Sequence, residues 1–483
     1  MNERTPPNPS DLADRVAEIN ASAPTVPVFP PQWQATVLLS PYGDANPPNG
    51  WTNYSQHVIG EVSYDVDLGM MVGLYLPEDL KYFRFLFVNG EGWYWIDAAP
   101  RGPMKRYFGP FATPLKVPGA DFMSRSKARF GERWEITNTS CVHWVLPTPN
   151  SSSPPDHGSW YSFRSDNGNL YRIFTFDPEN PRLFPVLGSY YLAHVPSFEA
   201  GADSELQSLV KAVKSGKPAA DGGYVNPLLT QRDIQTAMTK PLASAPCTLA
   251  QIQAVIPGYV PLPSGVPLPV WTDKTFILGM CIGTDLIPYY TFVSYWYSFG
   301  KQQTIFIGLG QVAGEGNYAL RQDCCLFRDY TDVPQYVAQG NTWVLECCSK
   351  IPGVGLPVPN WVSADGGVVA ASISGNADFG LKPNEVLNLC RCSLDRGPGN
   401  LALFWVWFTG DQKGVLFTEA NFVDSTDHNL QLIDYTWFDR NAEWLKPDAF
   451  SDPCTSSSPI CPSSAALAAR PPAARMFGPR RIL

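Results

Sequence analysis

The chain has 483 residues, more than one hydrophobic core usually supports, so two domains are expected. Its composition, 44% hydrophobic and 16% charged, excludes an intrinsically disordered protein. The net charge of −9 is spread along the chain and no Lys/Arg run is interleaved with aromatic residues, which argues against a nucleic-acid-binding protein.

The first predicted element is a helix followed by a proline-rich segment. Ser10 is a suitable N-cap, and Leu12, Val16 and Ile19 share one helical face. The proline-rich segment then runs to Trp33. Residues 1–32 are therefore predicted to form a helical and proline-rich lead-in.

Neither a signal peptide nor a membrane span is visible in the sequence. The N-terminal residues lack an apolar region, and no apolar run approaches the roughly 18 residues that cross a bilayer. We therefore expect a soluble cytoplasmic protein without a transmembrane segment. The oligomeric state cannot be read from the sequence.

Residues 33–200 are predicted to form the first β domain. The segment 61–67 alternates acidic and apolar residues, and 81–97 has the pattern of a strand, a glycine turn and a strand. These patterns indicate antiparallel hairpins. The strict alternation places Glu61, Asp65 and Asp67 on a solvated outer face.

A helical linker with a proline-rich collar is predicted at 201–270. Three stretches between 203 and 256 have helical patterns, and Thr248 is a suitable cap for the last of them. The second helix and proline-rich segment end at Trp271, as the first pair ended at Trp33. The chain therefore carries an internal repeat.

Other landmarks recur in the same order. Val62-Ser63-Tyr64 matches Val293-Ser294-Tyr295, and the hairpin pattern at 160–174 matches that at 405–417. We predict a mainly β protein with a minor helical part, built as two tandem half-open antiparallel β-barrel domains joined by the helical linker. The second β domain spans 271–452, and the Ser-, Pro- and Ala-rich residues 453–483 form a disordered tail.

The sequence contains no cofactor or metal fingerprint. It lacks a P-loop, a dinucleotide motif, G-x-S-x-G and H-E-x-x-H. The eleven cysteines include no C-x-x-C pair with a His partner at zinc spacing. We expect buried free thiols and no metal, with a thiolate site in the second half as the alternative.

A family resemblance rests on the meander, the Gly90-Glu91-Gly92 hairpin, the Val117-Pro118 segment and the late hairpin at 160–174. Together they resemble the ependymin-related proteins and, more broadly, the half-open β-barrel group. That group includes bacterial lipoprotein carriers and the indole-rearranging enzyme of violacein synthesis. The resembling stretches are roughly 33–198 and 271–446.

The resemblance implies a curved sheet that cups a mostly apolar cavity, present twice in this chain. The chain departs from the secreted members because it lacks a signal peptide and their disulfide cysteines. It departs from the violacein enzyme because Val37, Leu38 and Leu39 follow Trp33 where reactive polar residues are expected. No catalytic residue is carried over.

Candidate ligand-binding residues are inward-pointing arginines and paired tryptophans on aromatic strands. A buried guanidinium needs an acceptor, either a structural carboxylate or a ligand oxygen. The tryptophans share a strand face in pairs, and each pair could equally be part of a core. The predicted ligand-binding set is Arg84, Trp93, Trp95, Arg172, Trp405 and Trp407.

Candidate catalytic residues are His143, Glu135 and Arg172. They are the titratable and charged side chains of first-half strands that could support acid–base chemistry without a cofactor. A lone histidine in a strand can instead be a structural residue.

Three functional hypotheses follow from the sequence. The first is a carrier or binding protein for an apolar small molecule. The second is a cofactor-independent isomerase or cyclase in natural-product biosynthesis, so whether the chain is an enzyme is left open. The third is a structural or protein-binding role.

Overall fold

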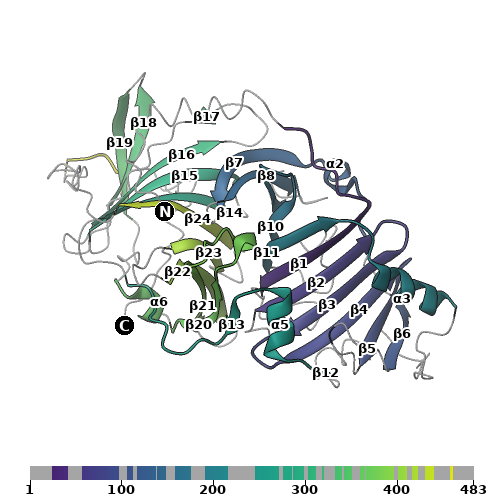
Figure 1. The fold of residues 1–483 in the computed structure, drawn as a ribbon. Coiled ribbons are helices and arrows are strands. Elements are labelled where there is room, and N and C mark those ends of the chain that lie inside the picture. The colour runs from purple at the N-terminus through teal and green to yellow at the C-terminus, as the bar shows by residue number, and fades with distance from the viewer. Residues whose placement is uncertain are drawn as a thin grey trace. The chain divides into compact units, whose positions relative to one another are not determined.

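The computed structural model describes most strands of the chain, and its elements are labelled in Figure 1. The described residues are 24–41, 57–96, 100, 106–112, 117–136, 139–147, 158–175, 191–215, 245–270, 276–284, 287–298, 303–311, 318–319, 332–339, 342–350, 359–364, 366–395, 401–410, 416–422, 430–439 and 457–460. The predicted helix that Ser10 caps, much of the linker and most of the predicted disordered tail lie outside these ranges.

The chain divides into two compact units, each assembled from separate stretches. Unit 1 comprises 1–23, 266–368 and 389–483, and unit 2 comprises 24–265 and 369–388. The five-segment division drawn from the sequence stays a prediction.

Unit 2 is built on one large antiparallel sheet. Its strands, purple to blue-green in Figure 1, are β1 (Gln32–Pro41), β2 (Val58–Asp65), β3 (Gly69–Leu76), β4 (Lys81–Val88), β5 (Glu91–Ile96), β6 (Arg106–Ala112), β7 (Arg129–Ile136), β8 (Thr139–Pro147), β9 (Gly158–Arg164), β10 (Leu170–Thr175) and β11 (Tyr191–Ala200). Their order is β6-β5-β4-β3-β2-β1-β11-β10-β9-β8-β7, and the short β12 (Ala245–Pro246) pairs with β4. The first and last strands of the meander therefore meet in the middle of the sheet.

The predicted hairpin at 81–97 is confirmed. Val88 on β4 pairs with Glu91 on β5, so Asn89 and Gly90 form the connection. Both have positive φ, 51° and 81°, as the two-residue hairpin turn that fits the twist of the strands requires.

Unit 1 contains a second antiparallel sheet, so the mainly β character predicted from the sequence is confirmed. Its strands are β14 (Phe276–Thr284), β15 (Ile287–Ser298), β16 (Gln303–Gln311), β17 (Tyr318–Ala319), β22 (Leu401–Thr409), β23 (Leu416–Phe422) and β24 (Leu430–Asp439). The order is β22-β23-β24-β14-β15-β16-β17, with the greater part of β21 (Val386–Asp395) beside β22. The strands β18 (Asp332–Gln339) and β19 (Thr342–Lys350) pair separately, and α6 (Trp361–Ala364) precedes β20 (Val368–Ser374).

The described helices are short. Unit 2 holds α2 (Phe122–Arg125), α3 (Ser204–Lys214), α5 (Leu249–Val255) and the 3-10 helix η2 (Ala377–Phe379), and the short β13 (Tyr259–Pro261) pairs with β20. Thr248 caps α5 as predicted, in a reciprocal capping box with Gln251. Among the described residues, no helix has the length and apolar character needed to cross a membrane.

The two faces of the unit 2 sheet differ in chemistry. One face carries a continuous apolar cluster, because residues of alternate parity along the strands are aromatic or aliphatic. The other face carries buried polar side chains, among them Arg84, His143 and Arg172. Apolar side chains such as Leu38 and Phe174 are buried beside them, so both faces of the unit 2 sheet are covered.

The prediction of a solvated face at 61–67 is wrong for Asp65, whereas Glu61 is half-buried and Asp67 is exposed. Asp65 is only 5% exposed, accepts a hydrogen bond from Gln32 Nε2 at 2.7 Å and caps the turn after β2. The Tyr75 hydroxyl donates to Glu61 Oε2 at 2.6 Å. Polar partners on neighbouring strands make this face a hydrogen-bonded layer, and only Asp67 is exposed.

Candidate functional site

The apolar face of unit 2 contains an aromatic box with a phenylalanine inside it. Phe29 lies in the irregular proline-rich segment before β1, and its backbone N–H donates to the Ala120 carbonyl at 3.0 Å. Its ring centroid lies 5.0 to 6.2 Å from those of four rings that form the aromatic box, Trp33, Phe122, Phe163 and Phe198. Two pairs are edge-on, an arrangement that favours contact between rings.

The walls of the aromatic box come from separate elements of unit 2. Trp33 lies on β1, Phe163 on β9, Phe198 on β11 and Phe122 on α2. Strand pairing joins β1 to β11 and β11 to β10, which in turn pairs with β9. The sheet therefore fixes three walls, while the occupant Phe29 comes from outside any helix or strand.

Tyr64 on β2 packs against Trp33, one wall of the aromatic box. Its ring stacks on Trp33 with centroids 5.0 Å apart, and its hydroxyl donates to the Pro118 carbonyl. Burial, followed by the nearby carboxylates led by Asp65, raises the pKa of Tyr64 to about 12. The hydroxyl thus stays protonated at neutral pH and acts as a hydrogen-bond donor.

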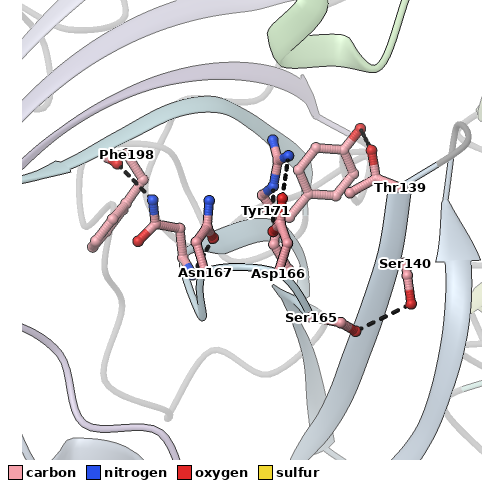
Figure 2. A network of polar contacts seen from close by, with 9 residues as sticks. Thr139, Ser140, Ser165, Asp166, Asn167, Tyr171 and Phe198 are labelled. Carbon is pink, nitrogen blue, oxygen red and sulfur yellow. Dashed lines mark hydrogen bonds and ion pairs between the residues drawn. The ribbon is translucent and has the colours of Figure 1, made fainter.

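The hairpin that carries Phe163 is tied to the strand that carries Phe198, as Figure 2 shows. Asn169 Nδ2 donates to the Phe198 carbonyl at 3.0 Å. In the same turn Arg164 donates to both carboxylate oxygens of Asp166, at 3.1 and 2.9 Å. The Asn169 bond therefore ties the hairpin of Phe163 to the strand of Phe198, and the Arg164–Asp166 pair closes the turn of that hairpin.

A buried polar row crosses the opposite face of the sheet. His143 on β8 pairs with Ser162 on β9, which pairs with Arg172 on β10, which pairs with His194 on β11. The Ser162 Oγ and His143 Nδ1 atoms are hydrogen-bonded at 2.8 Å. Two of the three predicted catalytic residues, His143 and Arg172, thus lie in one row.

Both histidines of the polar row are neutral at physiological pH. Burial and, second, the positive charge of Arg172 hold the pKa of His143 well below its usual range. The same causes lower the pKa of His194 to about 3. The row therefore presents neutral imidazoles beside one guanidinium that is only 1% exposed.

Glu135 lies apart from the polar row along the strands. On β7 it pairs with Ser140, whereas His143 pairs with Glu132. The side chains of Glu135 and Trp95 lie outside the described ones, and the role predicted for each stays a prediction.

Arg84 has a protein partner for its charge. Its Nη1 donates to Glu205 Oε1 of α3 at 2.6 Å, and its Nε donates to the Tyr82 hydroxyl at 2.9 Å. Burial, opposed by Arg84, raises the pKa of Tyr82 to about 12. Of the two partners considered from the sequence, the structural carboxylate is the one observed.

The remaining predicted ligand-binding residues are buried tryptophans. Trp93 lies on β5 of unit 2, and Trp405 and Trp407 lie on β22 of unit 1. Trp405 pairs with Ala420 and Trp407 with Thr418 on β23. Trp93 is not one of the four rings around Phe29, and the two unit 1 tryptophans belong to the other sheet.

Sequence reasoning missed Phe29, Ser162 and His194. Strict alternation along β10 would place Arg172 on the same face as Leu170, but the pairing of β9 and β10 shifts register between these two residues. Leu170 belongs to the apolar cluster and Arg172 to the polar row. A β-bulge of this kind cannot be recognised from the alternation of apolar and polar residues in the sequence.

Comparisons with known proteins identify no family for this chain. No protein-family model matches it, and no curated protein matches it. Among solved structures, the crystal structure of MucB is 11% identical, covers 62% of this chain and 78% of MucB, and has a TM-score of 0.21. MucB in complex with MucA(peri) is 10% identical, with coverages of 84% and 95% and a TM-score of 0.20. The Pseudomonas aeruginosa MucA/MucB complex gives the same identity and coverages with a TM-score of 0.21, and scores this low carry no argument.

Proposed function

We propose that the chain binds an apolar small molecule in the aromatic box of unit 2. The observation that carries the proposal is the occupant of the box: Phe29, a side chain from an irregular segment, fills a space walled by rings from three strands and a helix. An apolar site with aromatic walls is typical of small-molecule binding sites. Phe29 acts as a plug that the ligand replaces.

The plug must compete with the ligand for the same walls. The affinity of a ligand for a site that is mostly closed is reduced by the fraction of molecules in which the site is open. Phe29 is held by ring contacts and one backbone hydrogen bond to Ala120, and the nearby Pro31 carbonyl accepts a hydrogen bond from the Val66 N–H. Neither bond belongs to a pair of strands, so Phe29 can leave without breaking any strand pairing. Weakening the plug should therefore tighten ligand binding.

The tandem half-open barrel architecture is part of the same proposal. In unit 2, β1 pairs with both β2 and the late strand β11, and in unit 1, β14 pairs with both β15 and the late strand β24. The repeated Val-Ser-Tyr segments lie on β2 and β15, at equivalent places in the two orders. This common topology supports a duplication in which each half folds as a curved sheet.

Two variants test the binding proposal with effects of opposite sign. Phe29→Leu removes the ring of the plug, worth about 1 to 1.5 kcal/mol in aromatic contacts, so an environment-sensitive naphthylamine dye should bind about tenfold more tightly. Phe163→Leu removes a wall and should weaken the same dye by about the same factor. The measurement is a fluorescence titration of the full chain at fixed temperature.

Failure would be visible in two ways. If the dye binds neither the unaltered chain nor the Phe29→Leu variant, the aromatic box is a packed core and the proposal is rejected. If both variants weaken the dye equally, Phe29 is a wall and not a competing plug.

A cofactor-independent isomerase or cyclase is the second candidate, favoured by the hydrogen-bonded pair of His143 and Ser162 beside Arg172. A neutral imidazole can accept and return a proton, and the guanidinium can stabilise a developing enolate. This reading predicts that a ligand extracted after incubation differs in structure from the one added, although its mass is unchanged. His143→Asn should abolish the conversion, as followed by chromatography of the extract, and an unchanged ligand in every sample would contradict it.

A further inference from the structure

One wall of the aromatic box carries a hydrogen-bond donor. The indole of Trp33 is fully buried, and among the described residues no acceptor lies within hydrogen-bond reach of its Nε1. An indole N–H can only donate, and a buried donor without an acceptor costs free energy, so nearly all such groups in proteins are paired. The donor therefore calls for an acceptor that comes from elsewhere.

The position of Trp33 restricts where that acceptor can lie. Tyr64 stacks on its ring with an interplanar angle of 15° at 5.0 Å, and Phe198 stacks on it at 26° and 5.2 Å. Because stacked neighbours cover the ring faces, a molecule in the place of Phe29 meets the indole at its edge. The N–H also lies in the ring plane and points outward from an edge of the indole.

The natural occupant of the box, Phe29, cannot satisfy the donor. Its side chain is a hydrocarbon ring, and its centroid lies 6.2 Å from that of Trp33 with the planes tilted by 48°. A ligand that fills the same volume and also carries an oxygen would gain a hydrogen bond that the plug cannot make. This gain would favour the ligand over the plug.

We propose that the ligand of the aromatic box is an aromatic or cyclic apolar molecule with a carbonyl oxygen, and that Trp33 Nε1 donates a hydrogen bond to that oxygen. This inference rests on the proposed function and names its ligand class. Trp33 is then the residue that separates carbonyl compounds from hydrocarbons of the same shape. Specificity of this kind is expected where a buried polar group would otherwise stay unpaired.

The test uses two dyes that differ only in the carbonyl group. One is a dimethylamino-naphthyl ketone, and the other is its analogue with a methylene group in place of the carbonyl. Trp33→Phe should weaken the ketone about tenfold, the value of one hydrogen bond, and change the affinity of the analogue by less than about threefold. The emission of the bound ketone should also shift to the blue, because its carbonyl loses a hydrogen bond.

A second replacement guards against misfolding of Trp33→Phe. Benzothienylalanine at position 33 keeps the bicyclic ring and replaces the N–H with sulfur, and should give the same loss for the ketone. Tyr75→Phe is the matched control, since it removes a buried hydroxyl that donates to Glu61 on the opposite face of the sheet. Neither dye should respond to it.

The outcomes separate this inference from the proposed function. If both dyes bind the unaltered chain but the ketone is no more sensitive than its analogue to either replacement, Trp33 is a structural wall and the inference is overturned. If neither dye binds the unaltered chain or Phe29→Leu, the proposed function is overturned and the inference falls with it.

Discussion

Lowering the pH from about 6.5 to about 4.5 is expected to destabilise unit 2 by about 2 kcal/mol through His194 alone. The folded protein holds the pKa of His194 at about 3, because the ring is buried and lies near Arg172, while the unfolded chain titrates near 6.5. Between these values the unfolded state binds a proton that the folded state does not. Stability therefore falls as the pH drops through this window, and His143, whose pKa is also lowered, adds in the same direction.

The measurement is urea unfolding at a series of pH values, followed by tryptophan fluorescence. His194→Gln removes one titrating group, so the slope of stability against pH between about 4.5 and 6 should decrease by about 1.4 kcal/mol per pH unit. His143→Asn should reduce the slope as well, and its amide oxygen can still accept a hydrogen bond from Ser162. A profile that neither variant flattens would mean that the two histidines are charged or exposed in the folded protein.

The polar row illustrates why the sequence predicts strands more easily than sites. The alternation along 139–147 and 170–175 is local, so these segments could be read as strands. Which residues meet across the strands depends on register, and the pairings of Ser162 with His143 and Arg172 join separate stretches of the chain. Register is set by the turns and by the buried face as a whole, and neither can be read from one strand.

The aromatic box shows a second limit of sequence reasoning. The proline-rich segment before Trp33 has neither a helical nor a strand period, so Phe29 gave no pattern that marked it as buried. Its neighbours Phe122 and Phe198 lie far along the chain, and only the pairing of β1 with β11 brings part of the box together. Periodic elements were predictable, whereas contacts between an irregular segment and distant strands were not.

For Arg84, burial could be predicted from the sequence, but its partner could not. Its position on a strand made burial predictable, and the need for an acceptor followed from its charge. Its actual partner, Glu205, lies on α3, a helix in the stretch that was assigned to the linker. The same helix is anchored at its start by Asp203, which accepts a hydrogen bond from Ser63 of β2 at 2.5 Å. Helix α3 is thus fixed to the sheet by two polar contacts.

Removing the partner of Arg84 is expected to lower the free energy of unfolding of the chain by about 2 to 3 kcal/mol. Glu205→Leu leaves the guanidinium, only 2% exposed, with the Tyr82 hydroxyl as its acceptor. Breaking a fully buried ion pair costs about 3 to 5 kcal/mol, and the smaller value applies because the Glu205 side chain is 37% exposed. Denaturant unfolding of both proteins at neutral pH measures the difference.

A double-mutant cycle tests whether the lower stability of Glu205→Leu comes from the unpaired charge of Arg84. Arg84→Leu alone should cost less than Glu205→Leu, about 1 kcal/mol, because the carboxylate of Glu205 can turn to water. The double variant should be more stable than Glu205→Leu, since an apolar pair can replace a buried ion pair at little cost. If the two single losses simply add in the double variant, the ion pair contributes no coupling, and α3 is held to the sheet by its apolar side chains and by the hydrogen bond between Ser63 and Asp203.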